Sequence, residues 1–390
     1  MAIQTHYRTC NLCEAMCGIE IKVDGSEILS IRGDKNDPFS RGHICPKAVA
    51  LQDVYHDPDR LCYPVRRMAT GWEQIGWDEA FDEVVSNIKG IQQTYGRHAV
   101  GAYVGNPNGH NLASILFLAP FLRALGTRNL FSVTSVDQLP HHLTSYFMFG
   151  HQFLLPIPDI DLILGANPLA SNGSLMTAPG ISRRLRELKV RGGKVVVIDP
   201  RRSETAEKAN QHLFIRPGSD VLLLLGLIHT VYDENLASPG RLAEFTDGLE
   251  LMADIVSDYA PEKVARMTGI DGATIRQLAR DFAAVNSAVC YGRMGTSTQA
   301  FGGVAQWLIN TLNIVTGNFD RPGGAMCTTP AFDVVGITGM MRSTGHFRKL
   351  WGLQIPKRWR LRTSFYIRLR LSSIFRRRWA QNCCLVMWRR

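Results

Sequence analysis

The spacing of apolar residues changes along the chain. In the first 65 residues apolar and polar positions alternate, most clearly at Ile19, Ile21 and Val23, which predicts short β-strands. Asp24-Gly25 then predicts a hairpin turn, after which Ile28 begins the returning strand. This first part of the chain is therefore expected to be rich in antiparallel strands.

From Trp77 onward the apolar residues recur at helical spacing, with Asp78 as the predicted N-cap of the first helix. Beyond it, helices alternate with short, continuously apolar strands. We predict helices over 112–125, 181–190, 221–231, 273–284 and 304–315, and strands over 100–104, 161–164, 194–198, 213–215 and 288–291. Apolar strands separated by helices indicate a parallel, doubly wound, Rossmann-like sheet, so the predicted fold class is α/β.

A chain of 390 residues is longer than one ordinary core and suggests several domains. We predict a small cysteine-rich β domain over 1–65, two interleaved α/β domains over 66–335 and an irregular basic tail over 336–390. No apolar run reaches the roughly 18 residues that span a bilayer. Residues 1–8 show neither an apolar targeting segment nor a twin-arginine pair, so a cytoplasmic protein without a membrane span is expected.

The chain has a net charge of +10, and the whole excess of basic residues lies in the tail. After Asp333 there are 14 Lys and Arg residues and no acidic residue, which leaves 30 basic against 34 acidic residues before it and a net charge of −4 over 1–333. This distribution argues against a nucleic-acid partner. The tail also contains many Trp, Arg and Cys residues without a helical or strand period. We therefore interpret it as a shifted reading frame or another degenerate end rather than a basic binding arm.

Four cysteines stand in the first fifty residues with the spacing C-x2-C-x3-C-x27-C: Cys10, Cys13, Cys17 and Cys45. Four cysteine thiolates are the usual ligands of an iron–sulfur cluster. A structural zinc site usually pairs two C-x2-C knuckles, and Cys45 has no such neighbour. A disulfide is a third interpretation, but no secretory segment precedes Cys10. The spacing favours a 4Fe–4S cluster.

Gly, Asn, Asp and Ser are concentrated where the predicted strands end. In a parallel sheet, ligands bind outside the carboxyl ends of the strands, where glycines let backbone amides approach phosphates. One such loop is also typical of an ordinary turn, but four favour a nucleotide-type ligand: Gly105, 165–171, 199–201 and 292–296. The chain has neither G-x-G-x-x-G after a strand nor a P-loop, which excludes the usual NAD and ATPase fingerprints.

The cysteine frame and these loops resemble the molybdopterin-dependent oxidoreductases of the dimethyl sulfoxide reductase superfamily, which includes formate dehydrogenases, nitrate reductases and biotin sulfoxide reductases. The resemblance covers about residues 1–335 and includes a cluster motif over 10–18 and a fourth ligand and lysine within 41–47. It implies that Cys10, Cys13, Cys17 and Cys45 bind the cluster and that Lys47 lies between cluster and pterin. The alternative for Lys47 is a solvated loop lysine.

The resemblance also implies bis(molybdopterin guanine dinucleotide) carrying molybdenum or tungsten. It extends the cofactor loops to 216–220 and 316–324. The cofactor-binding residues that it implies are Gly165, Asn167, Pro168, Asp199, Arg201, Gly218, Asp220, Gly317 and Asn318. The strand-end loops described above add Ser171, Gly292, Gly295 and Thr296 to the predicted cofactor site.

Two features depart from the family's pattern. Many members ligate the metal through Cys, selenocysteine or Ser from a loop that corresponds to about Ser135–Ser145, where this chain has no Cys. Ser135 or Ser145 could ligate, His141 or His142 could carry protons, or no protein ligand exists; the His pair also has a structural interpretation. Family members are usually much longer, and their C-terminal barrel is missing here.

The leading hypothesis is an oxidoreductase that exchanges an oxo group or hydride with a small-molecule substrate, with a redox partner protein or electron-transfer subunit as a candidate partner. A non-catalytic iron–sulfur or pterin-binding remnant, or an electron-transfer module, is the alternative, and the nucleotide loops argue against the module. An inactive truncation product is a third hypothesis, which the missing barrel favours.

These departures predict how the 390-residue chain behaves. We expect it to be poorly soluble and to show no viologen-linked turnover, because exposed apolar surface favours aggregation and the resemblance places half of the pterin contacts in the missing barrel. A version with a corrected reading frame should turn over. Robust turnover by the purified 390-residue chain, with molybdenum bound stoichiometrically, would contradict the truncation hypothesis.

Overall fold

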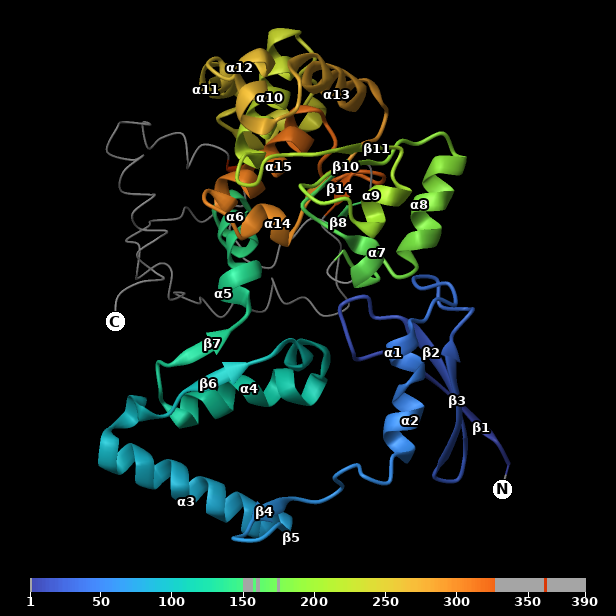
Figure 1. Ribbon diagram of the computed structural model, residues 1–390, viewed down its shortest axis with the longest axis vertical. Coiled ribbons are helices and arrows are strands. Elements are labelled where there is room, and N and C mark those ends of the chain that lie inside the picture. The colour runs from blue at the N-terminus through green and yellow to red at the C-terminus, as the bar shows by residue number, and fades with distance from the viewer. Residues whose placement is uncertain (1, 150–156, 159–161, 174–175, 327–360, 363–390) are drawn as a thin grey trace. The chain divides into compact units, whose positions relative to one another are not determined.

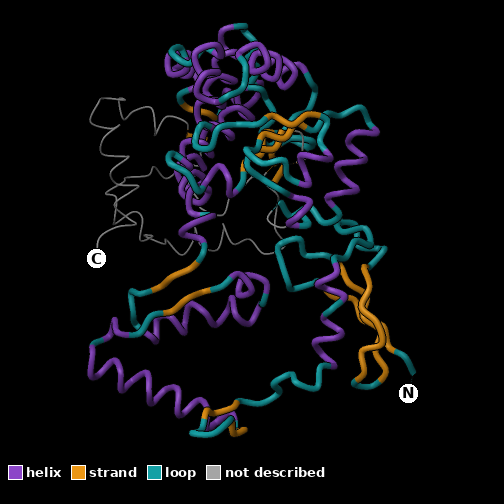
Figure 2. Tube along the Cα trace, in the orientation of Figure 1, coloured by secondary structure: helices purple, strands orange, loops and turns teal. Residues whose placement is uncertain are grey.

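The computed structural model describes residues 2–149, 157–158, 162–173, 176–326 and 361–362 (Figures 1 and 2). Contacts divide the chain into two compact units. Unit 1 comprises Met1–Ser135 and Ser171–Ser182, and unit 2 comprises Val136–Ala170 and Arg183–Arg390. Apart from Leu361–Arg362, the predicted basic tail lies outside the described residues.

Unit 1 starts with an antiparallel sheet in the order β1-β2-β3, formed by β1 (Gln4–Thr9), β2 (Gly18–Asp24) and β3 (Glu27–Gly33). The predicted hairpin is confirmed, since Asp24 pairs with Glu27 across the turn. Two short helices follow, α1 (Pro46–Val49) and α2 (Leu51–His56). The small core under this sheet contains cysteines as well as Ile19 and Ile31.

The remainder of unit 1 pairs short strands beside two longer helices. The strands are β4 (Val65–Arg67) with β5 (Trp72–Gln74), antiparallel, and β6 (Ala102–Val104) with β7 (Leu130–Ser132), parallel. The helices are α3 (Trp77–Tyr95), α4 (Leu112–Leu125) and the 3-10 turns η1 (Arg97–Ala99) and η2 (Asn106–His110).

The two longer helices of unit 1 begin at different kinds of N-cap. Helix α4 has the predicted bounds, and the side chain of Asn111 caps it by accepting a hydrogen bond from Ser114 N at 3.0 Å. The predicted N-cap of α3 is wrong, because Gly76 holds that position in an extended conformation. Asp78 lies in the first turn instead, where its negative charge interacts favourably with the helix dipole.

Unit 2 is built on a parallel sheet in the order β11-β10-β9-β13. The strands are β9 (Leu162–Leu164), β10 (Val196–Ile198), β11 (Gln211–Leu213) and β13 (Cys290–Gly292). The chain moves outward from β9 to β11 and then returns to the other side of β9, which is the strand order of a doubly wound sheet. The predicted parallel α/β sheet is therefore present, and its switch point lies between β9 and β13.

Some strand bounds differ from the prediction. The last strand before the long helices was expected over 213–215, yet β11 occupies Gln211–Leu213. Asp199 N donates to Leu213 O, whereas Arg216 N already donates to Thr268 O outside the sheet. Apolar character continues to Ile215 because this residue enters the core, not because it pairs in the sheet. The strand that was predicted over 288–291 likewise begins later, at Cys290.

Helices α10–α13 gather beside this sheet (Figure 1). The predicted helices appear as α8 (Ile181–Val190), α10 (Asp220–Asp233), α13 (Gly272–Ala284) and α15 (Gly302–Val315). The further elements are α5 (Thr134–Asp137), α6 (Leu139–Phe149), α7 (Pro168–Ser171), α9 (Glu204–Lys208), α11 (Met252–Val256), α12 (Pro261–Thr268), α14 (Met294–Ser297), η3 (Gly240–Glu244), η4 (Leu249–Leu251), and the pairs β8 (Ile157–Pro158) with β14 (Ala325–Met326) and β12 (Thr246–Asp247) with β15 (Leu361–Arg362).

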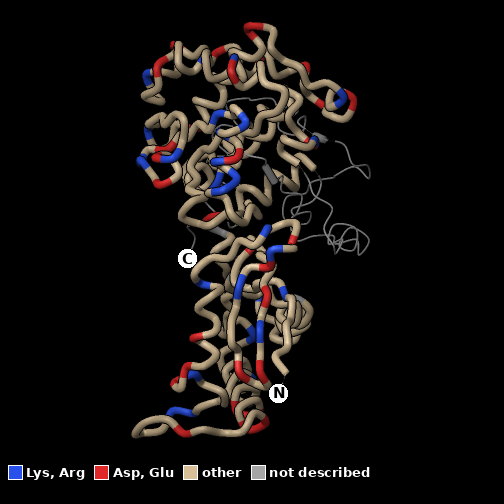
Figure 3. The backbone as a smooth tube through the Cα atoms, turned by 90° about the vertical axis from the view of Figure 1, so that its right-hand side faces the viewer, with Lys and Arg blue, Asp and Glu red and all other residues tan. Residues whose placement is uncertain are grey.

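Lys and Arg positions are interspersed with Asp and Glu positions along the described elements (Figure 3). This agrees with the small net charge of the chain before the tail. Within the described ranges, no helix is both long enough and apolar enough to cross a membrane.

The outer edge of β13 is paired by side chains of helix α15 and the turn after it. Asn313 accepts a hydrogen bond from Cys290 N at 2.9 Å and donates to Cys290 O at 2.8 Å. Asn318 accepts from Ala288 N at 3.0 Å. These amides replace a neighbouring strand, so a buried sheet edge is hydrogen-bonded without another strand.

Replacing Asn313 by Ala should therefore destabilise unit 2. Both Cys290 backbone groups would stay buried without this partner, which costs roughly 2 kcal/mol of unfolding free energy. Urea unfolding followed by circular dichroism measures it. The matched control is Asn310→Ala on the same helix, whose amide donates to Met148 Sδ at 3.5 Å. Equal losses in the two variants would show that the edge contact is not what Asn313 contributes.

Candidate functional site

The four cysteines of the N-terminal frame share one small core in unit 1. Cys10 and Cys17 are buried, and Cys13 and Cys45 are partly buried. Cys10 N donates to Cys17 O at 2.8 Å, which closes the loop that carries three of the thiols. The fourth, Cys45, is the N-cap residue of α1. The fold thus gathers residues from both ends of the predicted cysteine frame.

Burial makes the two buried thiols, Cys10 and Cys17, poor acids. Desolvation raises the pKa of Cys17 to about 11, and charge repulsion from Cys10, Cys13 and Cys45 adds to the shift. Desolvation also raises the pKa of Cys10, opposed by a hydrogen bond with the backbone of Leu12 and helped by charge repulsion from Cys13 and Cys45. Four thiolates this close together need a cationic centre, and iron clusters bind thiolates. The four thiols therefore fit a 4Fe–4S cluster. A single metal ion is a different case: among the described residues, no group of three His, Cys, Asp or Glu side chains is placed to hold one.

Asp37 shapes the loop that delivers Cys45. Its carboxylate accepts hydrogen bonds from Ser40 N at 2.7 Å and from Gly18 N at 3.3 Å. Burial alone would raise the pKa of Asp37, but the hydrogen bonds from Ser40, Phe39 and Gly18 hold it below its usual value. Lys47 lies on α1, two residues after Cys45, and is exposed.

The loops after β9 and β13 touch at the switch point of unit 2. Gly295 N donates to Gly165 O at 3.0 Å, and Arg293 N donates to Leu164 O at 3.2 Å. A Cβ on Gly165 would lie 2.8 Å from Thr296 N, and one on Gly295 would lie 2.8 Å from Gly165 Cα. Both glycines thus permit backbone contact between the loops, a role that the sequence did not predict beside the expected approach to a phosphate.

A second group of predicted residues surrounds Asp199, which follows β10. Asp220, at the start of α10, has its pKa raised by burial, opposed by a hydrogen bond with Gln299, and raised further by the charge of Asp199. Gly218 adopts a φ of +85°, and a Cβ there would meet only Gln299 Oε1, at 3.8 Å. Two carboxylates beside an open glycine fit a ligand edge rich in N–H donors, such as guanine.

Asn167, which directly precedes α7, forms hydrogen bonds with two residues of α9. Its Oδ1 accepts from Thr205 Oγ1 at 2.7 Å, and its Nδ2 donates to Glu204 at 2.6 Å. Thr205 Oγ1 is also the acceptor for Leu169 N in α7, at 3.1 Å. Arg201 is exposed and lies 3.8 Å from Glu204. Of the other predicted residues in α7, Pro168 is buried and Ser171 ends the helix.

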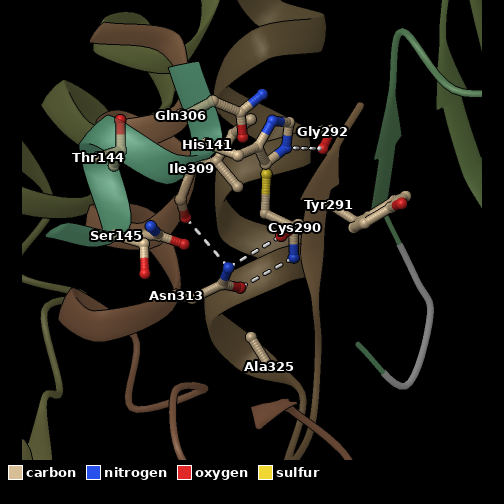
Figure 4. A pocket seen from close by; sticks show the side chains of 11 residues that line it. His141, Thr144, Ser145, Cys290, Tyr291, Gly292, Gln306, Ile309, Asn313 and Ala325 are labelled. Atoms are coloured by element: carbon tan, nitrogen blue, oxygen red, sulfur yellow. Dashed lines mark hydrogen bonds between the residues drawn. The ribbon is translucent and has the colours of Figure 1, made fainter. Parts of the chain in front are cut away.

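A small cavity lies between α6, β13 and α15 (Figure 4). Its lining includes His141, Thr144, Ser145, Cys290, Gly292, Gln306 and Asn313. His141 Nε2 lies 3.0 Å from Gly292 O, and His141 Nδ1 lies 3.0 Å from Ser297 Oγ. Burial lowers the pKa of His141 to about 4. Burial also lowers the pKa of His142, against the opposing charge of Asp137.

The stretch Ser135–Ser145 was predicted as a loop, and this prediction is wrong. It falls in α5 and the first half of α6, because Leu139, Leu143 and Met148 follow helical spacing and Met148 enters the core of unit 2. Ser145 is buried.

Gly317 and Asn318 do not join the other predicted cofactor residues. Asn318 bonds Ala288, which precedes β13, so it lies at the amino end of the strand whose carboxyl end carries Gly292. Sequence reasoning also missed Gln306, which donates to Thr296 Oγ1 at 2.7 Å and to Ser297 Oγ at 3.1 Å. An amide within the apolar run of α15 was the signal that could have found it.

The fold and the cysteine set define an α/β protein with an N-terminal iron–sulfur type of domain. The chain belongs to the molybdopterin oxidoreductase family: residues 60–330 match the family described as Molybdopterin oxidoreductase, and residues 3–57 match the Molybdopterin oxidoreductase Fe4S4 domain. The resemblance drawn from the sequence is confirmed. The two matches indicate a 4Fe–4S cluster and a molybdopterin-type cofactor with molybdenum or tungsten.

The chain is similar to relatives whose names describe different activities. The chain is 29% identical to formate dehydrogenase H of Escherichia coli, over 80% of this chain and 44% of the relative. It is 30% identical to a nitrate reductase of Synechocystis, over 80% and 45% of the two chains. The structure of acetylene hydratase from Pelobacter acetylenicus superposes with a TM-score of 0.67 at 25% identity, over 82% of this chain and 44% of that chain. The chain thus spans less than half the length of these relatives.

The cysteine assignment predicts the iron content. Anaerobically purified protein should contain about four irons and four sulfides per chain. Cys17→Ser and Cys45→Ser should lose the cluster, measured by iron analysis and the visible charge-transfer absorption. Cys62→Ser, at an exposed thiol, is the control and should keep it, as should Cys290→Ser in unit 2. Equal loss from Cys62→Ser would show that the ligand set is misassigned.

Proposed function

We propose that the protein is a molybdopterin-dependent oxidoreductase in which Cys10, Cys13, Cys17 and Cys45 bind a 4Fe–4S cluster. In this proposal the cluster exchanges electrons with a bis(molybdopterin guanine dinucleotide) metal centre held by unit 2. The bound metal centre would supply oxo or hydride transfer to a small substrate. A redox protein or subunit would exchange electrons with the cluster.

One observation carries the proposal: the same chain has a four-thiol core and a parallel sheet whose switch point is rich in polar loops. Ligands of doubly wound sheets bind at the switch point, outside the carboxyl ends of the strands. Gly165 and Gly295 meet there, and Asp199 follows the adjacent strand. An electron-transfer module has no need of a second, nucleotide-type site, so the enzyme is favoured over the module.

The residues of unit 2 would divide the work of holding the dinucleotide. Asp199 and Asp220 would accept hydrogen bonds from the guanine or ribose, and Gly218 would leave space for the base. Asn167 would fix α7 against α9 through Thr205, so that the loop after β9 keeps its shape. Arg201, which is exposed beside this loop, offers positive charge to a phosphate.

By its resemblance to the family, Lys47, two residues after Cys45, would lie between the cluster and the pterin. Its ammonium group would favour a reduced, more negative cluster by charge attraction. The chain's own contribution to catalysis is otherwise positional: it would hold the two cofactors and keep bulk water from the metal.

The alternative is a remnant that binds cofactors without turnover. Viologen-linked assays with formate and with nitrate, the substrates named for two relatives, distinguish them. They should be made on the 390-residue chain and on a version with the reading frame restored. Turnover in the restored version supports the enzyme. A restored version that holds both cofactors but neither reduces viologen with formate nor reduces nitrate with reduced viologen supports the remnant.

The guanine site predicts a specific loss. Asp199→Ala would remove an acceptor from the proposed guanine contact, which costs roughly 1–3 kcal/mol, or about tenfold in cofactor retention. Guanine nucleotide and pterin released from the purified protein measure it. Asp258→Ala, at an exposed carboxylate in the same unit, is the control. Normal guanine and pterin content in Asp199→Ala would count against the assignment.

A further inference from the structure

The hydrogen bonds of His141 form a chain with a fixed direction. Gly292 O can only accept, so His141 Nε2 must carry a proton and donate to it across 3.0 Å. In the neutral ring Nδ1 is then an acceptor, and Ser297 Oγ donates to it across 3.0 Å. Gln306 Nε2 in turn donates to Ser297 Oγ at 3.1 Å. Along this chain each donor therefore has an acceptor: Gln306 donates to Ser297, Ser297 to His141, and His141 to Gly292.

Two more contacts hold the same end of α6. Gln138, just before the helix, accepts a hydrogen bond from Arg293 Nη1 at 2.7 Å. One turn further on, Thr144 donates to Gly303 O at 3.1 Å. Together with His141, these contacts fasten the start of α6 to the loop after β13 and to α15. That loop is the one whose Gly295 touches Gly165 at the switch point.

The surroundings leave little space for an additional group at Gly292. A Cβ there would lie 2.2 Å from Ile309 Cδ1 and 2.9 Å from Thr296 Oγ1. The titratable and charged groups around the ring are Arg293, His142, Cys290 and Tyr291. A proton on Nδ1 would place an imidazolium close to Arg293, and Ser297 would have to turn its hydroxyl toward Arg293 O at 3.3 Å.

We infer that His141 is a positioning residue that fixes the start of α6 at the switch point, and that it is not the proton carrier the sequence suggested. The inference rests on the proposed function only in that the segment it fixes would border the metal centre. Its direct consequence is that the ring keeps one tautomer, protonated at Nε2, at neutral pH.

Two substitutions separate positioning from proton transfer. Glutamine can offer an N–H donor near the place of Nε2 and an acceptor beside it, but it cannot carry a proton. Leucine has comparable bulk and offers neither. We expect His141→Gln to retain pterin and guanine within about twofold of the wild type, and His141→Leu to lose about tenfold, because buried partners are left unpaired.

Nitrogen-15 NMR of histidine measures directly which ring nitrogen of His141 is protonated. In protein labelled with nitrogen-15 in its histidines, the signal missing from His141→Gln identifies His141. Its shifts should report a protonated Nε2 and a bare Nδ1, unchanged between about pH 5.5 and about pH 8, a range in which an ordinary imidazole titrates. Ser297→Ala should shift the Nδ1 signal, because it removes the donor to that nitrogen.

Titration of His141 within that range, or equal cofactor loss in His141→Gln and His141→Leu, overturns the inference. The NMR measurement does not need the cofactor. If wild-type protein contained no pterin, the proposed function would fail while the tautomer of His141 would still be decided.

Discussion

The contact between Gly165 and Gly295 is the constraint on which the arrangement of unit 2 depends. Two loops from neighbouring parallel strands meet there, backbone to backbone, because neither residue has a Cβ. The meeting fixes where β13 ends relative to β9 and brings Arg293, Thr296 and Ser297 over the switch point. A side chain on either glycine would separate the loops that carry the proposed cofactor site.

From this contact, polar bonds spread through the apolar core. Ser297 reaches His141 on α6, and Gln306 reaches both Thr296 and Ser297 from α15. Farther along α15, Asn313 pairs the edge of β13. Buried polar groups of this kind stabilise a structure only when all are satisfied, so they hold helix, strand and loop in one arrangement. A site that must orient a large cofactor benefits from such rigidity.

Sequence patterns predicted the elements whose signals are local. The bounds predicted for α4 and α8 from their apolar residues agree with the structure. The spacing of the four cysteines predicted that they lie together in the fold, because ligands of one metal cluster must lie close to each other. Signals that depend on distant partners were missed. Gly165 was predicted only as part of a cofactor loop, because its contact with another loop depends on Gly295, about 130 residues away in the sequence.

Asn318 and His141 show the same limit. Asn318 belongs to a motif that the family resemblance assigns to the cofactor, but in the fold it bonds the backbone of Ala288. His141 has a residue type that suggests proton transfer, and its two ring nitrogens both face fixed partners. Which atoms a side chain faces is decided by packing between elements, and a single sequence carries no direct record of it.

The central claim is that one polypeptide holds an iron–sulfur cluster and a molybdopterin metal centre that exchange electrons. Electron paramagnetic resonance of the partly reduced protein tests it most directly, because two nearby paramagnetic centres split each other's signals. The account predicts a molybdenum or tungsten signal that is split when the cluster is reduced and collapses to an unsplit signal when the cluster is oxidised. A cluster signal without any metal-centre signal, or a metal-centre signal indifferent to the state of the cluster, would contradict it.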